Sequence, residues 1–358
     1  MSEQTSHKKG KMKKRKLALR IFISVALILF FVYSVDLQET FEVILNTNYL
    51  LLLVCLIIYL LGQSISAYKW GVISKVIGFK NTYVEYLQYY YIGMFFNLFL
   101  PTTIGGDVGK AYYLSKGDPN GRKAPAIYTV LAERFSGLTV LVWLGTIALV
   151  SPVGHNVPLT IKIFAVCLSL AILIGAPLFP YFNKLAFSRK NWINRSMMKD
   201  VKVFWEYKLV LKCLGLSLLF HGLVILIHIL IGLAIKLDVP LMYYFAVYPV
   251  VAIIGFIPIA FNGIGVREGA YIYFFKLAGV DISHSFAFGI LWFAIVVIAS
   301  LIGGIVYIKG HHAPPKMDDE NEFTLKNIAE QEEIDSEDEL KDDKINVSNN
   351  LISHKNQG

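Results

Sequence analysis

Two glycine-rich segments, each beginning at a proline, contain most of the residues whose types and spacing could do chemistry. The first runs from Pro101 to Lys110 as PTTIGGDVGK, and the second runs from Pro258 to Gly269 as PIAFNGIGVREG. An offset of 157 residues aligns Pro101 with Pro258, Gly105 with Asn262, Gly106 with Gly263 and Lys110 with Arg267. The agreement in both residue type and spacing indicates that the two segments are related parts of one structure.

These segments predict a site for a negatively charged group. Glycine permits positive φ and close backbone approach, and a helix that starts after such a turn presents unpaired N–H groups and the positive end of its dipole. Lys110 and Arg267 would add full positive charges beside them. The candidate binding residues here are Gly105, Gly106, Asp107, Lys110, Asn262, Gly263, Gly265, Arg267 and Glu268. The alternative is a pair of structural turns whose cations extend to the membrane surface.

A further acid and base, Glu133 and Arg134, lie inside the apolar stretch 124–150. At about 1.5 Å per residue they lie roughly 12 Å from the start of that helix, near the middle of a bilayer. Ionisable groups at this depth are costly, so each needs a partner or a polar cavity. Neighbouring positions diverge by about 100° on a helix. We therefore expect Arg134 to pair with Asp107, and Glu133 with Lys110 or Arg267, as a structural lock or as a substrate or gating site.

The remaining reactive side chains point to no cofactor. His221 and His228 are seven residues apart on one face of an apolar stretch, where they could relay protons or serve as a transferase base. Hydrogen-bonded core histidines are the preferred interpretation. The three cysteines lie far apart without the spacing of a metal site, and we expect buried thiols. No metal and no cofactor is predicted.

The elements that must position these residues are membrane helices. Hydrophobic residues make up 55% of the chain, charged residues make up 17%, and the mean hydropathy is +0.55. Apolar runs of about 20 residues are long enough to cross a bilayer. Six spans are predicted, at residues 17–35, 49–67, 124–150, 159–179, 209–236 and 284–308. The predicted fold class is therefore an all-α membrane protein.

Two shorter apolar stretches, 86–101 and 243–258, differ because each ends at a proline followed by one of the glycine-rich segments. The loops 68–80, 110–123 and 181–208 carry three, four and seven basic residues, whereas 36–48, 151–158 and 237–242 carry none. Basic loops remain in the cytoplasm. This rule makes 86–109 and 243–279 two re-entrant helical hairpins, and it places both termini in the cytoplasm of a multi-pass cell-membrane protein. The eight segments then form an inverted repeat, an arrangement that places substrate near the midplane.

The charge distribution divides the chain into three parts. After Lys316 there are 13 acidic and 4 basic residues, so the remainder carries 30 basic and 13 acidic residues. We expect a basic cytoplasmic tail at 1–16, a transmembrane domain at 17–309 and an acidic disordered tail at 310–358. The basic residues adjoin apolar spans, which favours an anionic membrane surface over nucleic acid.

The motifs around Gly105, Glu133 and Asn262 resemble those of the flippase-like family defined by the transmembrane domain of lysylphosphatidylglycerol synthases. The resemblance covers residues 17–309, with the three motifs in the same order. It implies movement of an anionic phospholipid, aminoacyl-phospholipid or polyprenyl-linked substrate between leaflets, with the glycine-rich motifs and the Glu133–Arg134 pair as the functional core. Full synthases carry a soluble aminoacyl-transfer domain after the membrane part, whereas an acidic tail follows here, so synthase activity is not expected.

The prediction is therefore a lipid transporter of the flippase type. One alternative is the membrane part of a phosphatidylglycerol lysyltransferase or another lipid-modifying transferase, for which Asp36 and Glu39 are the candidate acids. Another is a scaffold that recruits such an enzyme. The predicted partner is a membrane lipid, with a second copy of the chain and a synthase or glycosyltransferase as further candidates.

Overall fold

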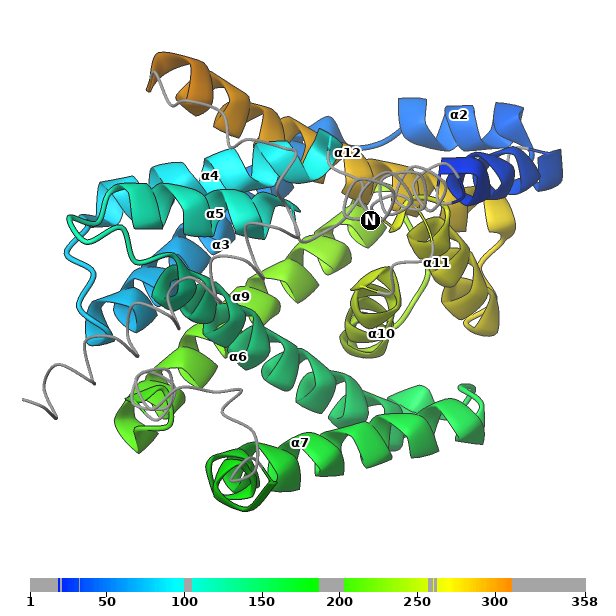
Figure 1. The fold of residues 1–358 in the computed structure, drawn as a ribbon. Helices are drawn as coiled ribbons and strands as arrows, with labels where there is room; N and C mark the ends of the chain where they lie inside the picture. Colours follow the sequence, from blue (N-terminus) through cyan, green and yellow to red (C-terminus); the bar gives the residue numbers. More distant parts are fainter. Residues whose placement is uncertain are drawn as a thin grey trace, which may run out of the picture.

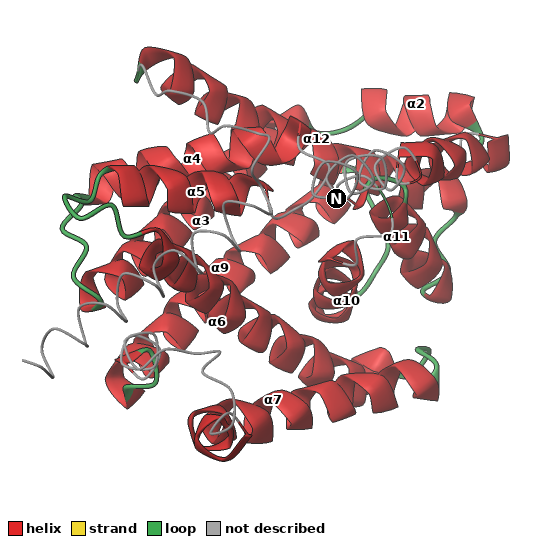
Figure 2. Ribbon diagram, in the orientation of Figure 1, coloured by secondary structure: helices red, strands yellow, loops and turns green. Residues whose placement is uncertain are grey.

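The computed structural model describes residues 19, 21–31, 33–99, 105–186, 203–256, 260 and 263–310. Within these ranges the chain is helical and contains no strand (Figure 2), which confirms the all-α prediction. A helix at Ile21–Phe31 precedes the labelled elements. These are α2 (Leu37–Leu45), α3 (Tyr49–Val76), α4 (Tyr83–Phe99), α5 (Gly105–Lys116), α6 (Lys123–Val150), η1 (Pro152–Gly154), α7 (Leu159–Ala186), α9 (Tyr207–Ala234), η2 (Leu241–Tyr243), α10 (Tyr244–Phe256), α11 (Val266–Leu277) and α12 (Ile282–Lys309). The predicted tails lie outside the described residues, apart from Gly310.

Five helices are long and apolar enough to cross a membrane. They lie in α3, α6, α7, α9 and α12. Each coincides with a predicted span, so the multi-pass architecture is confirmed. The sixth predicted span, residues 17–35, corresponds only to the shorter apolar helix Ile21–Phe31, because residues 20 and 32 lie outside the described ranges.

Helix α3 continues nine residues beyond its predicted end. The sequence prediction ended this span at Ala67 and assigned Lys69 and Lys75 to a cytoplasmic loop. In the structure both lysines belong to α3, and Lys69 is buried. The helix continues because Trp70 and Ile73 are also buried and extend its packed face. The prediction was wrong here because counting basic residues treats every lysine as exposed to water.

Two consecutive helix pairs contain the glycine-rich segments. Helices α4 and α5 pack against each other and form the first pair, and α10 and α11 pack against each other and form the second pair. The connecting residues 100–104 and 257–262, except Ala260, lie outside the described ranges. Figure 1 shows the two pairs on different sides of the molecule, and both α4 and α11 pack against α12.

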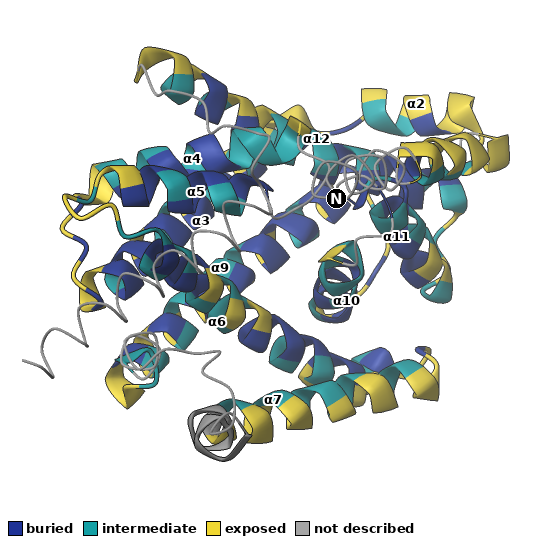
Figure 3. Cartoon of the chain, in the orientation of Figure 1, coloured by how far each residue is buried: buried dark blue, intermediate teal, exposed yellow. Residues whose placement is uncertain are grey.

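Helix α7 differs from the other long helices. None of its 18-residue apolar window is buried, and Figure 3 colours this part of α7 as exposed or half-buried. It packs on α6, where the Thr146 hydroxyl donates to the Ala165 carbonyl at 3.1 Å. Cys55 and Cys213 are buried as predicted, but Cys167 is exposed on α7. An apolar helix with this exposure is suited to contact lipid.

Candidate functional site

Five charged side chains from three helices form one connected network. Helix α3 contributes Lys69, α5 contributes Asp107 and Lys110, and α6 contributes Glu133 and Arg134. In this network every acid contacts two cations. Such dense pairing offsets the large cost of removing charges from water.

The pairing of Arg134 with Asp107 confirms the sequence prediction. The Arg134 Nε donates to Asp107 Oδ2 at 2.8 Å, and its terminal nitrogen donates to Asp107 Oδ1 at 2.9 Å. This two-point geometry is among the strongest that a carboxylate accepts. Lys110 Nζ also lies 2.9 Å from Asp107 Oδ1, so one carboxylate links α5 to α6 and neutralises part of two cations.

Glu133 joins the network to α3. Its carboxylate lies 3.1 Å from Lys69 Nζ and 3.6 Å from Lys110 Nζ, so the predicted pairing with Lys110 is confirmed. Lys69 also donates to the Glu133 carbonyl at 3.1 Å and to Ser217 Oγ on α9 at 2.9 Å. All three charged side chains are at least 95% buried. They therefore hold α3, α5, α6 and α9 together as well as carrying charge.

Arg267 has a different environment. It lies in the first turn of α11 and has no hydrogen bond or ion pair with any residue that the structure describes, although its Nε is buried. Its guanidinium carbon lies 5.7 Å from the centroid of the Phe293 ring. The aliphatic part of the side chain faces Gly255 on α10. A buried guanidinium N–H without an acceptor is costly, and a bound anion would satisfy it.

One cavity connects Arg267 with the network. It has a volume of about 290 Å³ and lies between the two helix pairs and the central parts of α3, α6, α9 and α12. Its charged lining residues are Lys69, Lys110, Arg134 and Arg267 against Asp107 and Glu133. Four cations therefore face two anions, and the surplus of two positive charges makes the cavity attractive to an anion. Tyr59, Tyr90 and Trp292 supply apolar and aromatic surface on its walls.

The glycines of the two segments lie beside this cavity but do not line it. Gly106 allows close approach of α5 to α4, because an added methyl group would overlap the Gly93 carbonyl and the Asn97 side chain. Gly263 and Gly265 have φ of +73° and +85°, which confirms the expected positive φ in the second segment only. Gly105 lies at the buried start of α5, and Asn262 is outside the described residues.

The sequence predicted helix N-termini with unpaired N–H groups, but the protein's own side chains already accept hydrogen bonds from two of these groups. The Gly106 N–H donates to Asn97 Oδ1 at 2.7 Å, and the Gly265 N–H donates to Glu268 Oε2 at 2.7 Å. Glu268 is thus a cap for α11, with no place in the cavity lining. Of the predicted site residues, the structure brings five to the cavity: Asp107, Lys110, Glu133, Arg134 and Arg267.

The two histidines are hydrogen-bonded in the core, in agreement with the preferred interpretation. His221 Nε2 lies 2.9 Å from the Gly137 carbonyl and its Nδ1 lies 2.8 Å from the Tyr248 hydroxyl. His228 contacts the Val224 carbonyl at 2.8 Å and the Tyr271 hydroxyl at 2.7 Å. One nitrogen of each ring faces a carbonyl, to which it can only donate, and the other faces a phenol hydroxyl that is able to donate to it, so both rings can be fully paired as neutral imidazoles.

Sequence reasoning missed the contribution of α3 to the site. Tyr59, Gln63 and Ser66 line the cavity together with Lys69. A signal was available, because these residues recur at spacings of three and four along an otherwise apolar helix. Residues at such spacings share one helix face, and a polar face within a membrane span indicates a cavity or a partner helix.

The chain matches a known protein family, whereas no solved structure matches it. The family described as the lysylphosphatidylglycerol synthase TM region matches residues 17–304. A UPF0104 membrane protein of Pyrococcus horikoshii is 25% identical over 117 residues, which are 32% of this chain and 35% of that protein. A UPF0104 membrane protein of Methanocaldococcus jannaschii is 30% identical over 127 residues, which are 35% of this chain and 37% of that protein. These alignments thus span about a third of each relative, and the match to the family covers most of the chain. The chain belongs to the lysylphosphatidylglycerol synthase TM region family.

Proposed function

We propose that this protein moves a lipid with an anionic headgroup between the leaflets of the cell membrane, and that the cavity binds the headgroup during transfer. The observation that carries the proposal is the charge of the cavity lining, four cations against two anions, with Arg267 lacking an ionic partner among the described residues. A phosphate accepts hydrogen bonds from a guanidinium in a two-point geometry. The aromatic walls suit the adjoining apolar part of a lipid.

The proposed architecture is an inverted repeat in which the two helix pairs are re-entrant hairpins and both termini are cytoplasmic. The shared offset of 157 residues between the glycine-rich segments supports it. So does the packing of the two pairs around one cavity. In transporters with inverted repeats, substrate binds near the midplane between broken helices, where exposed backbone is sheltered from lipid.

The transport proposal is tested by replacing Arg267 with Gln in the reconstituted full chain. The flip rate of a fluorescent phosphatidylglycerol should fall by about ten- to a hundredfold, which corresponds to the ~1.5–3 kcal/mol of a hydrogen bond to a charged group. A fluorescent phosphatidylcholine should be affected less. Lys276→Gln is the matched control, because Lys276 is an exposed cation at the other end of α11. An unchanged rate in Arg267→Gln would show that the cavity does not select anionic headgroups.

The topology is tested separately with single cysteines in a chain whose three native cysteines have been replaced. Asn120 lies in the exposed turn between α5 and α6, which the proposal places in the cytoplasm. A cysteine at this position should react with a membrane-impermeant maleimide only after the cells are opened. Labelling of intact cells would refute the re-entrant arrangement of α4 and α5, whatever the transport assay shows.

A further inference from the structure

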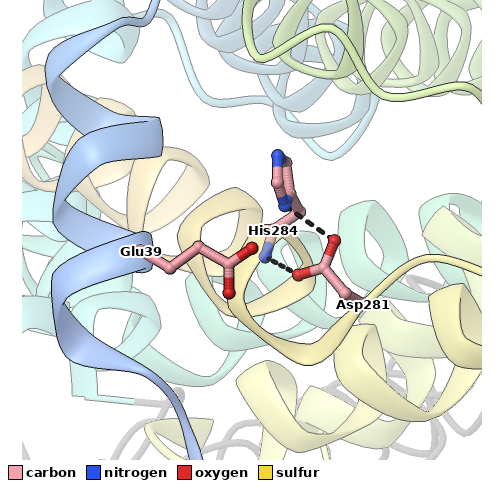
Figure 4. Close-up of side chains that lie close together, drawn as sticks. All are labelled: Glu39, Asp281 and His284. Carbon is pink, nitrogen blue, oxygen red and sulfur yellow. Dashed lines mark hydrogen bonds and ion pairs between the residues drawn. The ribbon is translucent and has the colours of Figure 1, made fainter.

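Three potential metal ligands meet at one end of the molecule, away from the cavity lining. Glu39 lies in the first turn of α2, Asp281 is the N-cap of α12, and His284 lies in the first turn of α12. One ligand atom from each side chain falls within 4.8 Å of the other two. Figure 4 shows the Glu39 side chain extending from α2 toward the Asp281–His284 pair. Residues separated by more than 240 positions therefore converge on one point.

The charges at this point are unbalanced. Asp281 Oδ1 accepts a hydrogen bond from the His284 backbone N–H at 2.8 Å, and its Oδ2 lies 2.7 Å from His284 Nδ1. That nitrogen is buried, and the contact is not aligned as a hydrogen bond. The Glu39 carboxylate has neither a hydrogen bond nor an ion pair with another residue in the described part of the chain. Two carboxylates thus converge, and neither forms an ion pair with a lysine or arginine in the described ranges, an arrangement that a cation would stabilise.

We propose that Glu39, Asp281 and His284 bind a divalent transition-metal cation of the Zn²⁺ class. The donor set carries this assignment, because one imidazole nitrogen with two carboxylate oxygens suits zinc, whereas calcium and magnesium prefer oxygen ligands alone. Three protein ligands leave at least one position for water. Both carboxylates are largely exposed, so an ion can reach them from solvent.

A bound ion would join α2 to the start of α12. The helix Ile21–Phe31 precedes α2, and its Leu27 and Phe31 lie against Gly265 and Gly269 of the second glycine-rich segment. Phe31 also contacts Phe286 on α12, with ring centroids 6.2 Å apart. The ion therefore holds this N-terminal unit against α11 and α12, and its role is separate from lipid binding in the cavity.

The test is zinc binding to the full chain in detergent, purified without a polyhistidine tag and stripped with EDTA. Isothermal titration should show one saturable site whose affinity falls about tenfold or more in Glu39→Gln and in His284→Gln. Glu42→Gln is the matched control, since Glu42 is exposed on the same helix and lies outside the cluster. His7, His311, His312 and His354 are common to all these variants, so differences between the variants report on the cluster.

Asp281→Asn keeps an N-cap oxygen on α12 while removing the charge, so it should fold and yet bind zinc weakly. Cobalt provides a second readout, because direct ligation produces visible absorption bands that should be lost in His284→Gln. Zinc should also raise the melting temperature of the wild type by more than that of Glu39→Gln at the same zinc concentration. Wild-type protein without saturable binding, or equal affinity in wild type, Glu39→Gln and His284→Gln, would overturn the proposal.

Discussion

The two helix pairs carry cations at positions that the offset of 157 residues aligns, Lys110 and Arg267, yet the two cations have different surroundings. In the first pair, Lys110 is enclosed by Asp107 and Glu133, and its Nζ lies 4.4 Å from the centroid of the Tyr90 ring. In the second pair, Arg267 faces the cavity without an ionic partner among the described residues. Correspondence in sequence therefore does not imply the same electrostatic role.

The difference arises from the residues that surround each cation. The offset of 157 that aligns Lys110 with Arg267 aligns Asp107 with Ile264 and Glu133 with Ile290. Isoleucine thus stands at both aligned positions where α5 and α6 carry an acid. Lys110 pairs with acids that connect the helices, whereas Arg267 remains available to a ligand.

The largest effect is expected from Glu133→Leu, which leaves Lys69 and part of the Lys110 charge buried without an acid. Breaking a buried ion pair costs about 3–5 kcal/mol of folding free energy. Thermal and denaturant unfolding in detergent would measure this loss. The double variant Lys69→Met with Glu133→Leu should recover part of it, because the uncompensated charge is removed. If the single variant is as stable as the wild type, the network does not hold the helices together.

A smaller effect on folding should distinguish the two aligned cations. Lys110→Gln removes a charge that two buried acids contact, and we expect a loss of about 1.5–3 kcal/mol in unfolding free energy. Arg267→Gln should change stability by only about 0.5 kcal/mol, since no ion pair is broken. Both variants are compared in the same unfolding assay. Equal destabilisation would mean that Arg267 also has a structural partner.

The glycines allow the same comparison for packing. Gly106→Ala inserts a methyl group into the contact between α5 and α4, and overpacking of this kind costs about 1–3 kcal/mol. Gly263→Ala meets its nearest atom, the Gly255 carbonyl oxygen, at 3.2 Å and keeps a positive φ, which costs about 1–2 kcal/mol. Melting temperatures should rank wild type, Gly263→Ala and Gly106→Ala in falling order. The reverse order of the two variants would contradict the close approach in the first pair.

The smallest expected effect concerns the turn that joins the first pair to α6. Hydrogen bonds from Arg122 lower the pKa of Asp118, and Arg122 also donates to the Ile77 and Gly78 carbonyls at the end of α3. Because the folded-state pKa lies below the unfolded value of about 3.9, this stabilisation is present above that value and is lost as pH falls through the folded-state pKa. Asp118→Asn should be less stable than wild type at pH 7, and the gap should close on acidification. If the stability difference between wild type and Asp118→Asn does not change with pH, it does not come from the charge of Asp118.

The sequence predicted the helical architecture well and the site only in part. The Arg134–Asp107 pair was predictable, because an arginine in the middle of a membrane span must find an acid and few acids are available. The sequence prediction placed Lys69 in a water-exposed loop, because counting basic residues gives no information about tertiary packing. Glu268 was assigned to the ligand site although it caps its own helix, since local hydrogen bonding competes with ligand binding at a helix N-terminus.

The contact between Gly106 and α4 has a genetic consequence. Every amino acid that a single-nucleotide change can substitute for glycine carries a Cβ, and a Cβ at this position would overlap the Gly93 carbonyl. No single missense mutation can therefore preserve the contact, and a side-chain change on α4 would not relieve the overlap, because the overlapping atom is a backbone carbonyl oxygen. Codon 106 should thus tolerate far fewer substitutions than the codons of the exposed residues on α7, and a saturation library scored for folded protein would show the difference directly.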